Sequence, residues 1–423
     1  MVVSKISFAD VVQDQLNFDL TKPHHALAFQ LIDSSWMQRL RDISQTANTR
    51  LVYMFSEHSR FGHSLGVAHL ACQLLDQLIE HYPEVSEYAC AVAAASILHD
   101  SGHLAPGSHT AQKVWFKEKS DEHEHTSIRV VLGDTDVNKI LSSHSPELPA
   151  TVAKILSEDS SLPAWCWEII SGGGWNVDRG NWCMLDSVMA GVSYGKYNIP
   201  ALTDSIRITP AKHLALRENR LDAMMHFTVS RHAMYKQVYQ HRVLLATDML
   251  AGALVERARA IRSQLSFADH VMTSALNAKA EKDLTLSEIY WMRESWWRYH
   301  LAQWTRDTDS VIRDLSERLI NRRLFKTFRI RETDQLDQLL DQTKSCADDL
   351  GFDPQYYVHL ISTKNTNLGD SKRSMLVIRE DGSEVPLTQA EPLFDKMLEV
   401  SKHNKDSWIA VPAEVKRKLN RVR

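Results

Sequence analysis

The segment from Tyr88 to Leu98 is almost continuously apolar and rich in alanine, and it ends in the pair His99-Asp100. A helix that is apolar on every side has to be buried inside a larger protein. An imidazole and a carboxylate at the end of such a helix are costly to bury unless they are paired or bind a metal ion. The sequence therefore predicts a buried helix from about Glu87 to His99, stopped near Gly102, that delivers two polar side chains to one centre.

Helical periodicity continues on both sides of this segment. Apolar residues recur at intervals of three and four from Leu65 to Ile79, and long helical patterns resume from about Pro210 to Arg259. The glycine-rich stretch 170–182 is expected to be a loop, so that Asp186 opens the next helix.

After about Ile330 the pattern changes. Residues 356–361 and 375–378 have the composition of strands, and Asp381-Gly382 is a strong hairpin signal. We therefore expect a mainly α protein, with a helical domain over residues 1–330, whose core is about 25–260, and a small α+β region over 331–423.

Charge and cysteine content exclude several classes. The net charge of -4 over 423 residues does not call for a nucleic-acid or membrane partner. The five cysteines are odd in number, widely spaced and without a C-x-x-C pair, which argues against a disulfide framework or a zinc ribbon. No apolar stretch reaches the roughly 20 residues needed to span a bilayer. We expect a cytoplasmic protein with no membrane partner.

Two further residues complete a metal-binding pattern. His63 lies in the stretch Arg60-Phe-Gly-His-Ser-Leu-Gly66, and Asp186 lies in Met184-Leu-Asp-Ser-Val188. Together with His99 and Asp100 they form a mixed nitrogen and oxygen set. Such a set suits an octahedral Mn, Fe, Mg or Co ion better than a closed tetrahedral zinc site. Four protein ligands would leave two positions for water and a substrate oxygen.

The ordered motif H…HD…D resembles that of the HD-domain metal-dependent phosphohydrolases, and most closely their deoxynucleoside triphosphate triphosphohydrolase branch. Other local stretches over about residues 25–260 are similar to that branch and follow in the same order. They are Gln38-Arg-Leu-Arg41, Arg60-Phe-Gly-His-Ser-Leu-Gly-Val67, His99-Asp-Ser-Gly-His103, His123-Glu-His-Thr-Ser127, and Arg231 through Tyr239-Gln-His-Arg242. The resemblance implies a helical HD-domain bundle.

The resemblance also implies roles for individual residues. The metal ligands would be His63, His99, Asp100 and Asp186. The catalytic residues would be His103, His123 and Arg60, with His123 the better candidate to protonate the leaving oxygen, since imidazole titrates near neutral pH. The substrate-binding residues would be Gln45, His109, Arg231, Tyr239 and Gln240; arginine clamps phosphate oxygens in a bidentate manner.

This sequence departs from the branch after the last metal ligand. The branch usually has a basic residue, then a tyrosine, then an aspartate that helps to hold the sugar. Counted without gaps from Asp186, these positions are Ser187, Ala190 and Tyr194. The acid expected to orient the second histidine is Gln112 here, and Glu118, Asp121 or Glu124 are alternative partners.

The expected activity is metal-dependent hydrolysis of deoxynucleoside triphosphates to deoxynucleoside and tripolyphosphate. Two alternatives stay open: an HD-type nuclease, phosphodiesterase or nucleotidase acting on another nucleotide substrate, and a nucleotide-sensing protein with reduced activity. The expected partners are a nucleotide substrate, a nucleotide activator, single-stranded nucleic acid under the alternatives, and further copies of the chain in a homo-oligomer.

Overall fold

A computed structural model describes residues 4–107, 114–116, 123–331, 335–363, 375–403 and 406–422. Its central element is α4 (Ser86–Leu98), which packs against α1, α3 and α8. The last eight residues of α4, Ala91 to Leu98, are all buried. This confirms the predicted apolar helix, and it places His99 and Asp100 at the helix end, inside the body of the molecule.

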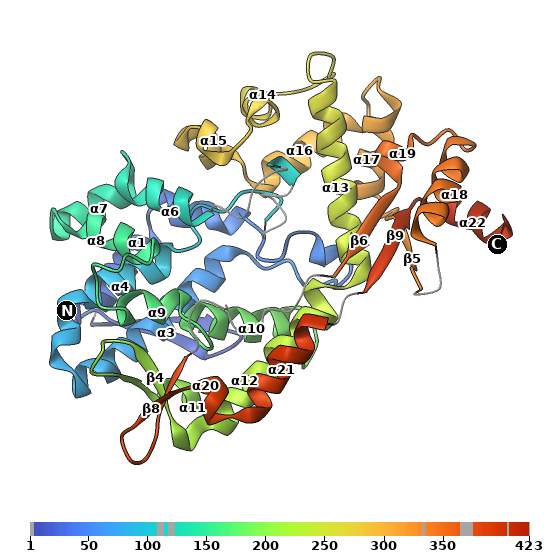
Figure 1. The fold of residues 1–423 in the computed structure, drawn as a ribbon. Helices are drawn as coiled ribbons and strands as arrows, with labels where there is room; N and C mark the ends of the chain where they lie inside the picture. The colour runs from blue at the N-terminus through green and yellow to red at the C-terminus, as the bar shows by residue number, and fades with distance from the viewer. Residues whose placement is uncertain are drawn as a thin grey trace.

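The protein is mainly helical, as expected, and its body contains most of the helices (Figure 1). They are α1 (Pro23–Ile32), α2 (Ser35–Arg39), α3 (Arg60–His81), α6 (His123–Leu132), α7 (Asp136–His144), α8 (Leu148–Leu156), α9 (Trp165–Ser171), α10 (Val177–Met189), α11 (Ile199–Thr203), α12 (Leu221–Met234), α13 (Arg242–Ala260), α14 (His270–Asn277), α15 (Leu286–Trp291), α16 (Glu294–Trp304) and α17 (Ser310–Ile320). A π-helical turn, Tyr235–Tyr239, follows α12. No helix among the described residues is long and apolar enough to cross a membrane.

Short strands form three small sheets. An N-terminal antiparallel hairpin joins β1 (Lys5–Asp10) to β2 (Asp14–Asp19). A second sheet has the order β3-β4-β7-β8 and is built from β3 (Ile206–Ile208), β4 (Leu214–Arg217), β7 (Leu376–Ile378) and β8 (Glu384–Pro386). The third has the order β5-β9-β6 and contains β5 (Lys326–Arg329), β9 (Ser407–Val411) and β6 (His359–Ser362).

The C-terminal segments therefore lie in two places, as the red ribbons of Figure 1 show. The helices α18 (Leu336–Asp348) and α22 (Ala413–Val422) pack against β9 of the third sheet, whereas β7 pairs in parallel with β4 in the body. Two further helices, α20 (Leu387–Ala390) and α21 (Pro392–His403), follow β8, and α19 (Pro354–Tyr357) precedes β6. The predicted hairpin is confirmed, because Asp381-Gly382 joins the antiparallel strands β7 and β8. Gly382 has a φ of 82°, which favours glycine.

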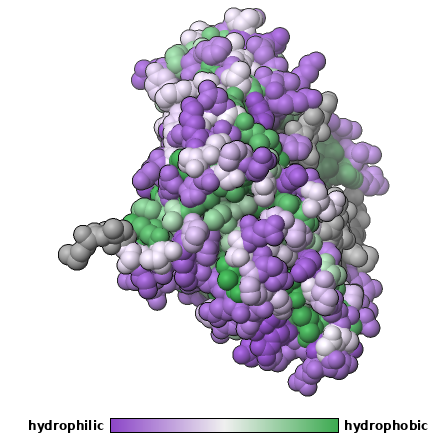
Figure 2. Space-filling view, turned by 90° about the vertical axis from the view of Figure 1, so that its left-hand side faces the viewer, coloured by the Kyte–Doolittle hydropathy of each residue, from purple (hydrophilic) through white to green (hydrophobic). Residues whose placement is uncertain are grey.

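Close packing of α3 against α10 positions the functional site. A Cβ added at Gly66 of α3 would lie 2.2 Å from Nδ2 of Asn181 on α10, so a larger residue there would have to displace the Asn181 side chain. The face of the molecule drawn in Figure 2 is mostly hydrophilic, and patches of hydrophobic residues interrupt it. Exposed apolar side chains include Met54 and Phe55 in the segment before α3.

Candidate functional site

His63 lies in the first turn of α3 and points across to α10. Its Nε2 atom is 3.0 Å from Oδ1 of Asp178 and 3.6 Å from Oδ2 of Asp100. On the other side of the ring, Nδ1 is 2.9 Å from Oδ1 of Asn181. His63 therefore faces two carboxylates with one nitrogen, and its orientation is held through the other.

His99 faces the same two carboxylates from the end of α4. Its Nδ1 donates to the carbonyl oxygen of Ser96 at 2.8 Å. Its Nε2 is buried, makes no hydrogen bond within the described part of the chain, and lies 3.4 Å from Asp100 Oδ1 and 3.5 Å from Asp178 Oδ1. Burial acts to lower the pKa of His99, but the two carboxylates outweigh it and raise that pKa.

This donor set fits a divalent metal ion. Because a carbonyl oxygen only accepts, Nδ1 of His99 carries a proton, and Nε2 is the ring atom that faces the two carboxylates, where it binds either a second proton or a metal ion. Facing lone pairs repel one another unless a cation lies between them. Hydrogen-bonded Nδ1 atoms are also how proteins orient metal-binding imidazoles. Ligand atoms at about 2.1 Å from an ion and at right angles lie about 3 Å apart, close to the distances seen among His63, His99, Asp100 and Asp178.

Asp186 does not join this cluster, although the sequence analysis assigned it as the fourth metal ligand. One carboxylate oxygen of Asp186 lies 2.7 Å from Nε2 of His58, and the other accepts a hydrogen bond from the Tyr239 hydroxyl at 2.5 Å. Asp178, eight residues earlier on the same helix, faces the two imidazoles instead. Burial acts to raise the pKa of Asp178, but the neighbouring imidazoles of His63 and His99 outweigh it and lower that pKa.

The helix was expected to start at Asp186, and this was wrong. The wrong start explains why Asp186 was assigned as the metal ligand in place of Asp178. Asp186 does not open a helix; α10 begins at Val177, where the Asn176 side chain caps the helix by accepting from Arg179 N. Counted from Asp178 instead of Asp186, the family pattern meets Arg179, Trp182 and Asp186. The three positions therefore hold a basic residue, an aromatic residue and an aspartate, as in the branch. This spacing is the sequence signal that indicates Asp178 as the metal ligand. In the structure the Arg179 guanidinium donates to the carbonyl oxygens of Gly172 and Gly174.

Arg60, His103 and His123, the expected catalytic residues, lie around Asp100. The Arg60 guanidinium donates to Asp100 Oδ2 at 2.5 Å, and His103 Nε2 lies 3.2 Å from Asp100 Oδ1. His103 and His123 stack with ring centroids 3.9 Å apart, and His123 Nδ1 lies 3.3 Å from Oε2 of Glu124. Burial, together with the nearby positive charges of Arg60 and His123, lowers the pKa of His103 well below its usual range.

The expected substrate contacts lie around Asp186 and along α12. Tyr239 reaches Asp186 and packs edge to face against Trp182, with ring centroids 5.5 Å apart. Arg231 is buried, and its guanidinium lies over the Tyr235 ring at 5.2 Å. Gln45 is buried and donates its backbone N–H to the His58 carbonyl. Gln240 follows Tyr239 and is half-buried. His109, the last expected contact, lies outside the described residues.

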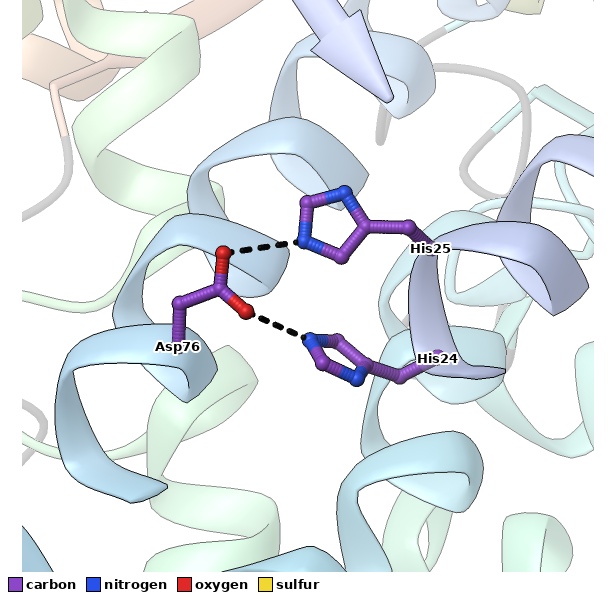
Figure 3. Close-up of side chains that lie close together, drawn as sticks. All are labelled: His24, His25 and Asp76. Carbon is purple, nitrogen blue, oxygen red and sulfur yellow. Dashed lines mark hydrogen bonds and ion pairs between the residues drawn. The ribbon is translucent and has the colours of Figure 1, made fainter. Parts of the chain in front are cut away.

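A second group of two histidines and one aspartate has the opposite arrangement. His24 and His25, in the first turn of α1, both point at Asp76 of α3, with each Nε2 3.1 Å from a carboxylate oxygen (Figure 3). Nδ1 of His25 accepts from the backbone N–H of Asp19, so its Nε2 carries the proton and donates to Asp76. Lys22 also donates to Asp76 at 2.7 Å. This group is a hydrogen-bonded network, with Lys22 and Asp76 as its ion pair, that holds α1 to α3.

No family model matches the chain. Curated proteins and solved structures that are similar to it were found. The uncharacterized protein YwfO of Bacillus subtilis is 31% identical over 346 residues, which cover 80% of this chain and 76% of YwfO. A deoxynucleoside triphosphate triphosphohydrolase SAMHD1 homolog of Dictyostelium discoideum is 27% identical over 270 residues, 58% of this chain and 49% of the relative. The chain thus spans about half the length of that relative.

Solved structures share the fold over nearly the whole chain. A phosphohydrolase of Bacteroides thetaiotaomicron is 23% identical with a TM-score of 0.82, covering 96% of this chain and 99% of that one. A hypothetical protein of Aquifex aeolicus is 25% identical with a TM-score of 0.72, covering 99% of each chain. At such identity the first of these likenesses speaks for the fold alone.

Proposed function

Because the chain belongs to the HD-domain phosphohydrolases, near their deoxynucleoside triphosphate triphosphohydrolase branch, we propose that it hydrolyses deoxynucleoside triphosphates to deoxynucleoside and tripolyphosphate. The observation that carries the proposal is the cluster of His63, His99 and Asp178, with Asp100 3.4 to 3.6 Å from the two imidazoles and Arg60 beside it. In this proposal Asp178 takes the place of Asp186 as the fourth metal ligand. A divalent Mn, Fe, Mg or Co ion held there supplies Lewis-acid activation of water and of a phosphoryl group when bound.

The residues around Asp100 supply the rest of the phosphate chemistry. Arg60 and Arg231 neutralise the charge that develops on the phosphate oxygens, which is usually the largest catalytic contribution. Water adds to the α-phosphorus as the bond to the 5′-oxygen breaks, so that tripolyphosphate leaves with the new oxygen. His123, whose Nδ1 lies 3.3 Å from Oε2 of Glu124, gives its proton to the departing 5′-oxygen. Burial and the positive charges of Arg60 and His123 lower the pKa of His103, which favours a neutral imidazole that can form hydrogen bonds to the phosphates.

The residues around Asp186 are proposed to hold the nucleoside. Asp186 accepts a hydrogen bond from the Tyr239 hydroxyl beside the aromatic ring of Trp182, and the two aromatic rings are suited to pack against the sugar and base. Gln45 and Gln240 are proposed to contact the sugar and base, and His109 stays a predicted contact. The nuclease alternative rested on Ser187, Ala190 and Tyr194; it loses that support when the pattern is counted from Asp178.

A direct assay tests the proposal. Purified protein is incubated with each deoxynucleoside triphosphate in Mn²⁺ or Mg²⁺, and products are separated by ion-exchange chromatography. Deoxynucleoside and tripolyphosphate should appear together, and the variant carrying His99→Ala and Asp100→Ala should form neither. Absence of product with every nucleotide, from protein shown to bind metal, would rule the proposal out. Faster cleavage of single-stranded oligonucleotides than of nucleotides would favour the nuclease. Cytoplasmic location, a nucleotide activator and homo-oligomeric assembly remain predictions.

A further inference from the structure

His58 lies directly before α3 and is held by Asp186. Its side chain is only 8% exposed, and its Nε2 lies 2.7 Å from Asp186 Oδ1. The second oxygen of that carboxylate accepts from the Tyr239 hydroxyl. Because a carboxylate only accepts, Nε2 of His58 carries a proton, and in the neutral imidazole Nδ1 is then a hydrogen-bond acceptor.

That acceptor is unused. Nδ1 of His58 is buried and has no hydrogen-bond partner in the part of the chain that the structure describes. An unsatisfied buried acceptor is unfavourable, and such exceptions in native proteins call for an explanation. A ligand atom that donates a hydrogen bond would satisfy it.

The position of His58 indicates which ligand atom this is. Ser59 is extended, with φ of -104° and ψ of 161°, so the side chains of His58 and Arg60 project to the same side of the segment. Arg60 reaches the phosphate side of the site through Asp100, and the carbonyl of His58 accepts from the backbone of Gln45. His58 thus stands between the groups proposed to hold the phosphates and those proposed to hold the sugar.

We propose that His58 is a substrate-contacting residue whose Nδ1 accepts a hydrogen bond from the sugar hydroxyl of the nucleotide. The inference rests on the proposed function and names a further determinant of its specificity. A deoxynucleoside triphosphate has a single sugar hydroxyl, at the 3′ position, and that hydroxyl can donate. His58 therefore favours nucleotides with a free 3′-hydroxyl over those that lack one.

Two amide variants separate this role from simple support of Asp186. In His58→Asn the amide oxygen can occupy the place of Nδ1, so the acceptor is kept and the contact with Asp186 is lost. In His58→Gln the amide nitrogen can occupy the place of Nε2, so the contact with Asp186 is kept and the acceptor at Nδ1 is lost. The measurement is kcat/KM for a deoxynucleoside triphosphate and for its 2′,3′-dideoxy analogue, on protein of equal metal content.

We expect wild type and His58→Asn to prefer the deoxynucleotide by a similar ratio, and His58→Gln to lose about tenfold of that preference, as for one hydrogen bond to a substrate hydroxyl. The opposite pattern, with the preference kept in His58→Gln and lost in His58→Asn, would show that His58 acts only by positioning Asp186. An unchanged preference in both variants would also overturn the inference. A wild-type protein inactive toward every nucleotide would instead remove the proposed function, and this inference with it.

Discussion

Replacing Asp178 by Asn would remove one of the two carboxylates that face His63 and His99. The other carboxylate, Asp100, is already paired with Arg60, so two carboxylates and one guanidinium leave a single net negative charge at the cluster. In the variant the cluster has no net negative charge, and it loses one of the four proposed ligand atoms. Residues that act on a metal only through its ligands already change affinity by about 10- to 100-fold, so Asp178→Asn should weaken Mn²⁺ binding by at least about 100-fold.

The measurement is calorimetric titration of metal-free protein with Mn²⁺, with bound metal then determined by mass spectrometry. Asp186→Asn is the matched control, because it makes the same change eight residues along the same helix. Asp186 is engaged by His58 and Tyr239, so this variant should bind Mn²⁺ within about threefold of wild type. If Asp186→Asn lost the metal while Asp178→Asn kept it, the assignment of Asp178 would be refuted and Asp186 would be the ligand.

Three further predictions concern stability. Arg39→Met should lower the urea-derived unfolding free energy by about 3 kcal/mol, because the fully buried guanidinium donates to several main-chain carbonyls that would be left unsatisfied. Burial lowers the pKa of His69 to about 4. Between pH 6.5 and about 4, His69 is therefore protonated in the unfolded chain but not in the folded chain. Stability should therefore fall by up to about 3 kcal/mol as the pH drops through that window, and His69→Gln should flatten this slope in the same urea series. Gly252 lies in the interior of α13 with open space around it, so Gly252→Ala should raise the free energy of unfolding by about 1 kcal/mol and raise the thermal midpoint. Gly107→Ala should lower the thermal midpoint, because the new Cβ would lie 1.9 Å from the carbonyl oxygen of Ser44.

Local signals were enough to predict several elements. The buried helix that ends at His99 follows from eleven nearly unbroken apolar residues, and the turn at Gly382 follows from the Asp-Gly dipeptide. His63, His99 and Asp100 could be selected because each lies within a short motif at a helix end. The helix and the turn are confirmed because each depends only on neighbours in the chain, whereas the roles of the three site residues stay predictions.

The helix α10 shows where such inference fails. Its glycine-rich beginning reads as a loop, but Asn176 caps a helix there, because its side chain satisfies a free backbone N–H. The helix consequently carries both Asp178 and Asp186, two turns apart. The one sequence signal that separates the two is the spacing of Arg179, Trp182 and Asp186 after Asp178. Which one faces His63 depends on how α10 is rotated and placed against α3.

By itself the sequence determined the helical class, the HD motif and three of the four residues that face one another at the cluster. Tertiary structure decided the fourth, because the close contact of Gly66 with Asn181 sets α10 so that Asp178 meets the two imidazoles and Asp186 meets Tyr239. Tertiary structure also decided that β4 pairs with β7, for example at Leu216 and Val377. Periodicity and capping act over a few residues, whereas these contacts join segments far apart in the chain, so they are set by packing in three dimensions.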